Sequence, residues 1–297
     1  MKHRRKLYIF SAVIMLAGLV SLLVQGLNEG IDFTSGNSFT LQMNRQVTLD
    51  DLDGIRQELA SFNLQGSVVR RIGDDLTQVE IRTSLLEDST QERMLKALEE
   101  KFPITETSVT VVDPAFSREL ARRALLALGV ALAGMLVYIS WRFEFRSAVT
   151  AIAALLHDAV VVMGVFSLFQ VEVDSAFVAA ILTIVGYSIN DTIILFDRVR
   201  ENFKGVARKE DASYLINLSI WQTLGRTINT GLTTLILVTV LFILGGVTIK
   251  PFALALLIGI SFGTYSSIFV ASALWLDWRL SAKQGAGPVS RSPKPAR

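Results

Sequence analysis

The sequence predicts an integral membrane protein, an all-α bundle of six transmembrane helices with a small α+β domain inserted between the first and second helices. Of the 297 residues, 51% are hydrophobic and the mean hydropathy is +0.45. The apolar residues are gathered into long blocks, and one polar stretch, residues 28–119, interrupts them. Blocks of about 20 apolar residues are typical of helices that cross a hydrocarbon core of ~30 Å.

Six apolar runs are long enough to span a membrane. They cover residues 7–25, 120–141, 147–169, 175–197, 227–247 and 251–276. The first run could be a cleaved signal peptide, but it is long for an h-region and no A-x-A-like site follows it. We therefore expect four parts: the N-terminus and first span (1–27), an external domain (28–119), spans two to six (120–278) and a disordered basic tail (279–297).

Lysine and arginine residues predict the orientation of the spans. They occur in four groups: Lys2, Arg4, Arg5 and Lys6; Arg142 and Arg146; Arg198, Arg200, Lys204, Arg208 and Lys209; and Arg279, Lys283, Arg291, Lys294 and Arg297. With six spans, all four groups fall on one side of the membrane. Because short cytoplasmic segments retain positive charge, we expect both termini in the cytoplasm and residues 28–119 outside it.

The polar stretch between the first two spans has the pattern of a small α+β domain. Strands are expected at 38–43, 66–73, 76–84 and 107–113, and helices at 48–62 and 90–102, the second capped by Ser89 or Thr90. The resulting order, βαββαβ, fits a ferredoxin-like sandwich. The stretch has no glycine-rich phosphate loop and no convergent set of acids, histidines and serines, which favours a contact or clamp module over an enzyme domain.

Several kinds of chemistry are excluded by composition. The chain has no cysteine and only two histidines, His3 and His157, so thiolate catalysis and imidazole metal clusters are not expected. GISFG matches the serine hydrolase pattern G-x-S-x-G, but Ser261 lies in an apolar helical run without a plausible histidine base. No P-loop motif is present, and the net charge of +2 is explained by topology. We expect no enzyme activity, metal, cofactor or nucleic-acid partner.

Polar residues inside the spans are the candidate functional residues. Asp158 lies near the middle of the third span, beside His157, and Asn190 and Asp191 lie within the fourth. The fifth span has polar residues at offsets 0, 3, 4, 7 and 8, which share one helical face: Arg226, Asn229, Thr230, Thr233 and Thr234. Intramembrane ionisable groups usually face a protein interior.

We expect Asp191 to face Arg226 across the bundle. A nearby guanidinium favours the charged carboxylate, whereas burial favours the protonated one, and a carboxylate balanced between these influences suits proton coupling. The alternative is that the polar groups only join helices through hydrogen bonds, and this reading is favoured for the serines and threonines. For Asp158 both readings stay open.

Five motifs resemble the SecF family of bacterial protein translocase subunits. They are GIDFTSG (30–36), LLHDAVVVMG (155–164), ILTIVGYSINDTIILFDRVREN (181–202), RTINTGLTTLI (226–236) and GTYSSIFVAS (263–272). The resemblance covers nearly the whole chain. It implies the resistance-nodulation-division (RND) superfamily and a multi-pass protein of the bacterial inner membrane with residues 28–119 in the periplasm.

The resemblance also implies a function and partners. Members act with SecD, using the proton gradient to promote late export of unfolded preproteins through the SecYEG channel with SecA, and YajC is a further implied partner. Protons are the coupling ion and membrane lipid surrounds the chain. The family's relay acid carries over to Asp191 in the SINDT motif and its arginine to Arg226, with Asp158 carried over from the HD motif.

One position departs from the family pattern. The family usually reads GIDFTGG after the first span, and here Ser35 replaces a glycine. A serine would be strained there if the position required a positive φ. Two other functions remain open: a small-molecule exporter subunit of the same superfamily, which should have a larger external region, and an assembly subunit without proton coupling.

Overall fold

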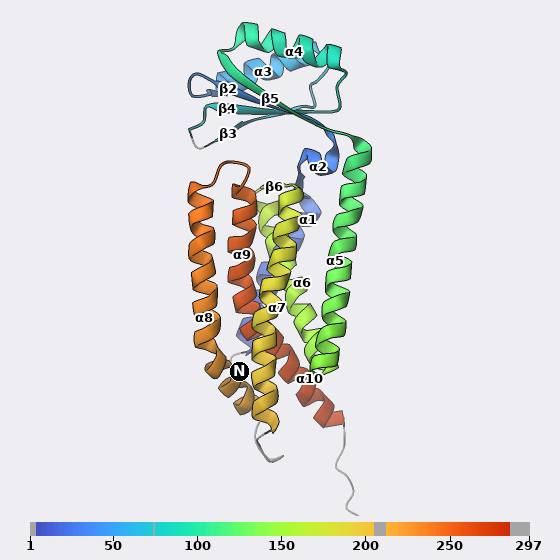
Figure 1. Ribbon diagram of the computed structural model, residues 1–297, viewed down its shortest axis with the longest axis vertical. Helices are drawn as coiled ribbons and strands as arrows, with labels where there is room; N and C mark the ends of the chain where they lie inside the picture. The colour runs from blue at the N-terminus through green and yellow to red at the C-terminus, as the bar shows by residue number, and fades with distance from the viewer. Residues whose placement is uncertain (1–3, 74, 205–211, 286–297) are drawn as a thin grey trace, which may run out of the picture.

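The computed structural model describes residues 4–73, 75–204 and 212–285. A bundle of long helices carries a four-stranded sheet with two helices at one end, and α1 begins and α10 ends at the opposite end (Figure 1). Six spans in the described residues are long and apolar enough to cross a membrane. They are α1 (Arg4–Val24), α5 (Pro114–Arg142), α6 (Phe145–Leu168), α7 (Ser175–Lys204), α8 (Ala212–Leu244) and a last span formed by α9 (Lys250–Ser266), η1 (Ser267–Ala271) and α10 (Ser272–Gly285).

The helices extend beyond the apolar runs that predicted them. α5 begins at Pro114 rather than 120, because Asp113 caps it by accepting a 2.7 Å hydrogen bond from the amide of Ala115. α7 and α8 likewise continue past the expected limits at 197 and 227. Hydropathy marks only the part of a helix that lies in lipid, so polar extensions escape it.

The expected tail also begins later than predicted. α10 continues to Gly285, so the first residues of the 279–297 segment are helical, contrary to the expectation of disorder. Residues 286–297 lie outside the described residues.

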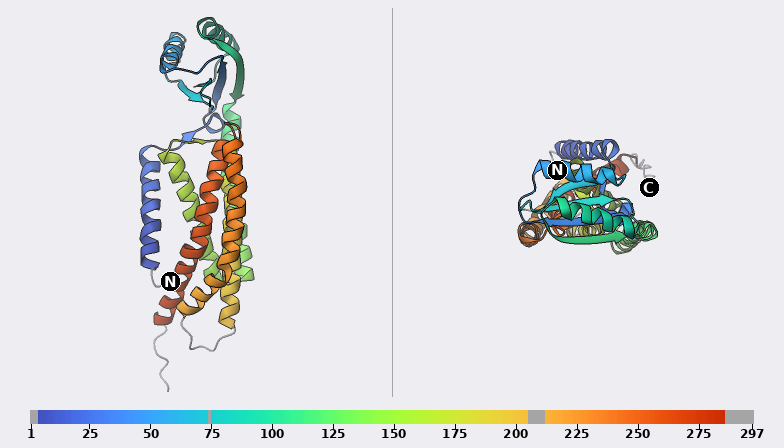
Figure 2. Two further views of the ribbon diagram at one scale, coloured as in Figure 1. Left: turned by 90° about the vertical axis from the view of Figure 1, so that its left-hand side faces the viewer. Right: turned by 90° about the horizontal axis from the view of Figure 1, so that it is seen from above.

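The inner helices of the bundle are α6, α7 and the last span, in which about half of the most apolar stretch is buried, while α1, α5 and α8 are peripheral. Figure 2 shows α1 along the outside of the bundle. α1 approaches α6 closely at Gly18 and Gly164, since a Cβ added to Gly164 would lie 2.5 Å from the Cα of Gly18. Exposed large apolar side chains cover the peripheral helices, as lipid-facing surfaces require.

The sheet domain has the expected βαββαβ order. Its elements are β2 (Gly36–Met43), α3 (Leu49–Ser61), β3 (Val68–Ile72), β4 (Gln78–Thr83), α4 (Asp88–Lys101) and β5 (Ile104–Val112). The strand order in the sheet is β3-β4-β2-β5 and all neighbours are antiparallel. α4 begins earlier than predicted, with Glu87 rather than Ser89 or Thr90 at the N-cap, whereas Thr48 caps α3 through a capping box with Asp51.

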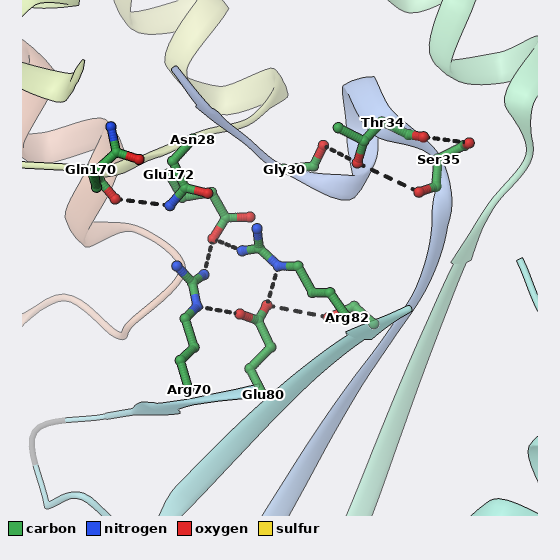
Figure 3. A network of polar contacts seen from close by, with 10 residues as sticks. Asn28, Gly30, Thr34, Ser35, Arg70, Glu80, Arg82, Gln170 and Glu172 are labelled. Carbon is green, nitrogen blue, oxygen red and sulfur yellow. Dashed lines mark hydrogen bonds and ion pairs between the residues drawn. The ribbon is translucent and has the colours of Figure 1, made fainter. Parts of the chain in front are cut away.

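Alternation along the strands gives the sheet two different faces. Val79 and Ile81 of β4 are fully buried in a core with α3 and α4, as are Phe39, Leu41, Ile55, Leu59, Met94 and Leu98. Because successive strand residues point to opposite faces, Glu80 and Arg82 lie on the other face, toward the helix bundle (Figure 3).

Short elements connect the domain to the bundle. β1 (Asn28–Glu29) follows α1 and pairs in parallel with β6 (Glu172–Val173), which precedes α7. α2 (Ile31–Thr34) then leads into β2. The exit from the first span is thus hydrogen-bonded to the entry into the fourth.

Candidate functional site

The carboxyl group of Asp158 is the centre of a buried polar cluster between three inner helices. Its Oδ2 accepts hydrogen bonds from Ser188 of α7 at 2.8 Å and from Ser266 of α9 at 2.7 Å. Its Oδ1 lies 3.0 Å from Nδ1 of His157. All four side chains are buried. Asp158 therefore has the partners that the sequence did not identify, and they join α6, α7 and the last span.

The cluster continues along α7 through a second pair of hydroxyls. Thr192 and Ser267 lie 2.9 Å apart, and Ser267 also donates to the carbonyl of Ser188 at 3.1 Å. Ser267 begins η1, a π-helical turn, a rare conformation that is frequent at functional sites. Ser266 and Ser267 both reach α7 at this point. Hydrogen bonds that join helices are the role that the sequence favoured for the serines and threonines.

Asp191 is buried without a complete set of partners. Its side chain is 2% exposed and its Oδ2 has no hydrogen-bond partner. The charge that acts on it is the guanidinium of Arg226 on α8, although the two side chains form no direct ion pair. The expected pairing of these two residues therefore stays a prediction. Asn190, the next residue along the helix, is exposed.

The polar face of α8 points largely away from the other spans of this chain. Arg226, Asn229 and Thr233 are exposed, and Thr230 and Thr234 are half-buried. The three threonine hydroxyls donate to carbonyls one turn earlier in their own helix, and Thr234 accepts a 3.2 Å hydrogen bond from Tyr187 of α7. The helical spacing correctly predicted that these residues share one face. Only part of that face contacts α7.

A network of charges joins the sheet domain to the bundle (Figure 3). Glu172, from the loop before α7, forms ion pairs with Arg70 of β3 and Arg82 of β4. Glu80 contacts the same two arginines, at 2.5 Å from Arg70 and 3.2 Å from Arg82. Arg82 is 8% exposed. Local sequence patterns could not predict this network, because Arg70 and Glu172 are about 100 residues apart in the chain.

The segment after the first span packs against the start of α7. Asp32 accepts a 2.9 Å hydrogen bond from the amide of Ser175, and Asp174 accepts one of 2.8 Å from the amide of Phe177. Burial raises the pKa of Asp174, and the nearby carboxylates of Glu172 and Asp32 raise it further. This segment therefore fixes the first residues of the helix that carries Asp191.

Ser35 adopts the backbone conformation that the sequence analysis identified as a source of strain. Its φ is 61° and ψ is 170°, a region occupied almost only by glycine. Gly36 has a φ of 120° and cannot be replaced by a residue with a side chain, because a Cβ there would lie 2.2 Å from the carbonyl oxygen of Thr83. The turn thus requires two glycine-like conformations and has one glycine.

Within the described ranges, no group of three histidine, aspartate or glutamate side chains is placed to hold a metal ion. The arrangement instead offers two buried carboxyl groups on adjacent helices, one fully hydrogen-bonded and one with an unpartnered oxygen.

Comparison with protein families gives two matches. Residues 90–281 match the C-terminal region of the SecD/SecF protein export membrane proteins, and residues 20–47 match the SecD/SecF GG motif. The second match includes the turn at Ser35 and Gly36.

Curated relatives are similar over almost the whole chain. The SecF subunit of the protein translocase of Haemophilus influenzae is 43% identical, and the alignment covers 93% of this chain and 85% of the relative. The SecDF subunit of Bacillus subtilis is 39% identical over 93% of this chain but only 37% of its own length.

A solved structure has the same fold. The crystal structure of SecDF from Thermus thermophilus, described as a translocon-associated membrane protein, superposes with a TM-score of 0.86 at 35% identity. The superposition covers 93% of this chain and 38% of that chain. This chain thus corresponds to one part of a longer relative.

Proposed function

Because the chain belongs to the SecD/SecF family of protein export membrane proteins, we propose that it is a proton-coupled accessory subunit of the Sec translocase. In this function it promotes the late export of unfolded preproteins through SecYEG with SecA. The chain is a multi-pass protein of the inner membrane with six spans. We further propose an RND-type bundle, cytoplasmic termini, and a ferredoxin-like domain in the periplasm.

The observation that carries the proton-coupling proposal is the environment of Asp191. A carboxyl group that is 2% exposed, has an unpartnered oxygen and lies under the influence of the Arg226 guanidinium can exchange a proton when helices shift. Each proton that crosses the membrane contributes roughly 2.3 kcal/mol per 100 mV, enough to bias a two-state rearrangement. Asp158 and Asn190 are proposed as supporting residues of the same relay.

The exposed polar face of α8 supports a partner in the membrane. An arginine and an asparagine facing hydrocarbon are costly, so Arg226 and Asn229 should be covered by protein in the working complex. We propose that the spans of SecD cover this face, consistent with relatives in which SecD and SecF form one chain. YajC is a further proposed partner. Neither an enzyme activity nor a cofactor other than protons is part of the proposal.

Proton-driven export also needs a mechanical connection between the bundle and the sheet domain, and the contacts between them support one. Glu172 links the sheet to the loop before α7, and α7 carries Asp191. A shift of α7 on protonation would therefore be transmitted to the sheet domain, which could act on the exported chain.

The test is export driven by the gradient in vesicles that contain the chain with its SecD partner and SecYEG. Asp191→Asn should reduce the completion of export of a labelled preprotein to the level seen with an uncoupler, because the variant holds no exchangeable proton. Thr183→Ala, at an exposed position of α7 outside the proposed relay, is the control for general damage. Normal gradient-dependent export by Asp191→Asn would overturn proton coupling through Asp191 and favour the assembly function.

A further inference from the structure

A cavity of about 320 Å³ opens at the end of the bundle opposite the sheet, where the α5–α6 junction, α7 and α10 meet. Cationic and aromatic side chains dominate its lining. Arg200 and Lys204 come from α7, and Arg279 comes from α10. The cavity shares no residue with the buried clusters around Asp158 and Asp191, so the proposed proton coupling makes no use of it.

The guanidinium of Arg279 is held in a defined place. It lies 4.2 Å from the ring centroid of Phe203 and 5.1 Å from that of Trp275. Trp275 is itself fixed by a 3.1 Å hydrogen bond from its indole nitrogen to Ser147. A guanidinium stacked through its flat face keeps the N–H groups of its edge available, which is the geometry that binds a phosphate through two parallel hydrogen bonds.

The charges around the cavity do not balance. Three cations, Arg200, Lys204 and Arg279, line it with one carboxylate, Glu144. The ion pairs between residues in the described parts of the chain include none of these four. Arg200 donates to the backbone carbonyl of Arg142 at 3.1 Å, and no carboxylate among the described residues forms an ion pair with it. This excess of positive charge favours the binding of an anion.

The depth of the cavity indicates which anion it meets. It lies at the ends of apolar spans, where aromatic side chains gather at the level of lipid headgroups. Basic pockets between spans at this level bind anionic headgroups. We propose that the cavity binds the phosphate of an anionic phospholipid, with Arg279 as the main contact and Arg200 and Lys204 as supporting charges.

The experiment uses the full chain purified in neutral detergent and titrated with phosphatidylglycerol, with bound lipid measured by native mass spectrometry. Arg279→Gln should weaken binding roughly tenfold, the size of one lost charge-assisted hydrogen bond. Arg198→Gln is the matched control. Arg198 lies on the same turn of α7 as Arg200, but it pairs with Glu201 and does not line the cavity. Phosphatidylcholine should bind more weakly than phosphatidylglycerol.

Two further arms make the outcome decisive. Arg200→Gln, at an exposed position, should weaken binding in the same direction, and it serves if Arg279→Gln fails to fold. Inorganic phosphate is titrated in the absence of lipid: if it binds as tightly as phosphatidylglycerol and depends equally on Arg279, the lipid assignment is overturned. Equal losses in Arg279→Gln and Arg198→Gln would also overturn the proposal, because general surface charge would then explain the binding.

Discussion

Ser188 of α7 donates a hydrogen bond to Asp158 of α6 across 2.8 Å in the interior of the bundle. Ser266 of the last span donates to the same oxygen at 2.7 Å. One carboxyl group therefore holds the three inner helices at a fixed relative position. Gly263 makes this approach possible, since a Cβ there would lie 3.0 Å from the Cβ of Ser188.

Removing this carboxyl group should destabilise the bundle. Asp158→Ala removes the acceptor of the buried hydroxyls of Ser188 and Ser266 and leaves Ser266 only a 3.2 Å contact with the carbonyl of Gly263, at a cost of about 2–4 kcal/mol in the free energy of unfolding. Asp158→Asn keeps an acceptor oxygen and should cost less. The measurement is denaturant unfolding in a lipid-detergent mixture, with Asn190→Ala as the exposed control. An Asp158→Ala protein as stable as the control would contradict a joining function.

The close contact of α1 with α6 should not tolerate a side chain. Gly164→Val places a branched side chain where even a Cβ lies 2.5 Å from Gly18, so α1 must move outward, at a cost of about 1–3 kcal/mol. Oxidative crosslinking of Ser21→Cys with Ser167→Cys, whose hydroxyls are 2.8 Å apart, reports the contact. The chain has no native cysteine to interfere.

The matched control for this change is Gly134→Val on α5, where a Cβ meets nothing within 4 Å. Crosslinking should fall in Gly164→Val and stay unchanged in Gly134→Val. Equal crosslinking in both would show that α1 is free to adjust without leaving α6.

The pair of Glu172 and Arg82 should contribute more than a surface ion pair. Arg82 is 8% exposed, so Glu172→Gln leaves its charge buried with weaker compensation. A double-mutant cycle with Arg82→Gln should give a coupling energy of about 1–3 kcal/mol in thermal unfolding. The exposed pair Arg56 and Asp53 is the control, with an expected coupling below about 0.5 kcal/mol. Similar couplings for the two pairs would mean that the junction is not held by these charges.

A glycine at position 35 should stabilise the strained turn at Ser35 and Gly36. Ser35→Gly removes the cost of φ 61° and ψ 170° and should raise stability by about 1 kcal/mol, after the greater freedom of glycine in the unfolded chain is subtracted. Gly36→Ala should do the opposite, because its Cβ would lie 2.2 Å from the oxygen of Thr83. Hydrogen exchange of β2 measures both effects. Slower exchange in Gly36→Ala than in the parent would refute this account of the turn.

The start of α3 should lose protection in acid. Two 2.7 Å hydrogen bonds from the side chain of Arg45, and then bonds from Thr48, hold the pKa of Asp51 well below its usual range. Since the folded pKa is depressed, the stabilisation is complete above the unfolded value of ~3.9 and is lost as pH falls below it. The protection factors of the α3 amides, which are corrected for the intrinsic pH dependence of exchange, should therefore fall below about pH 4. Asp51→Asn should reduce this fall, and an unchanged pH profile would exclude Asp51 as its source.

Local patterns predicted the elements well. The six apolar runs became six spans, and the alternation and helical spacing in residues 28–119 gave the observed βαββαβ order. Both signals depend on neighbours within a few residues in the chain. The helix ends were predicted less well, because capping groups such as Asp113 and Glu87 carry no hydropathy signal.

The partners of the buried acids could not be predicted in the same way. Asp158 meets Ser188 and Ser266, which are 30 and 108 positions away, and that register depends on how the helices pack. Asn190 is exposed although Asp191 is buried, because adjacent helical residues point about 100° apart. The sequence also could not predict where the polar face of α8 points, because the protein proposed to cover that face is another chain.

The π-helical turn η1 joins α9 and α10 in the last span and changes the rotation of the helix between them. Its wider winding sets the rotation of α10, which directs Asp277 to the hydroxyl of Tyr8 at 2.8 Å and to Arg4 at 2.9 Å. Rewinding that turn to ordinary α geometry would twist α10 by about 100° and swing Asp277 away from both residues. A local change of helical pitch beside Ser267 would in this way separate α10 from the first turns of α1.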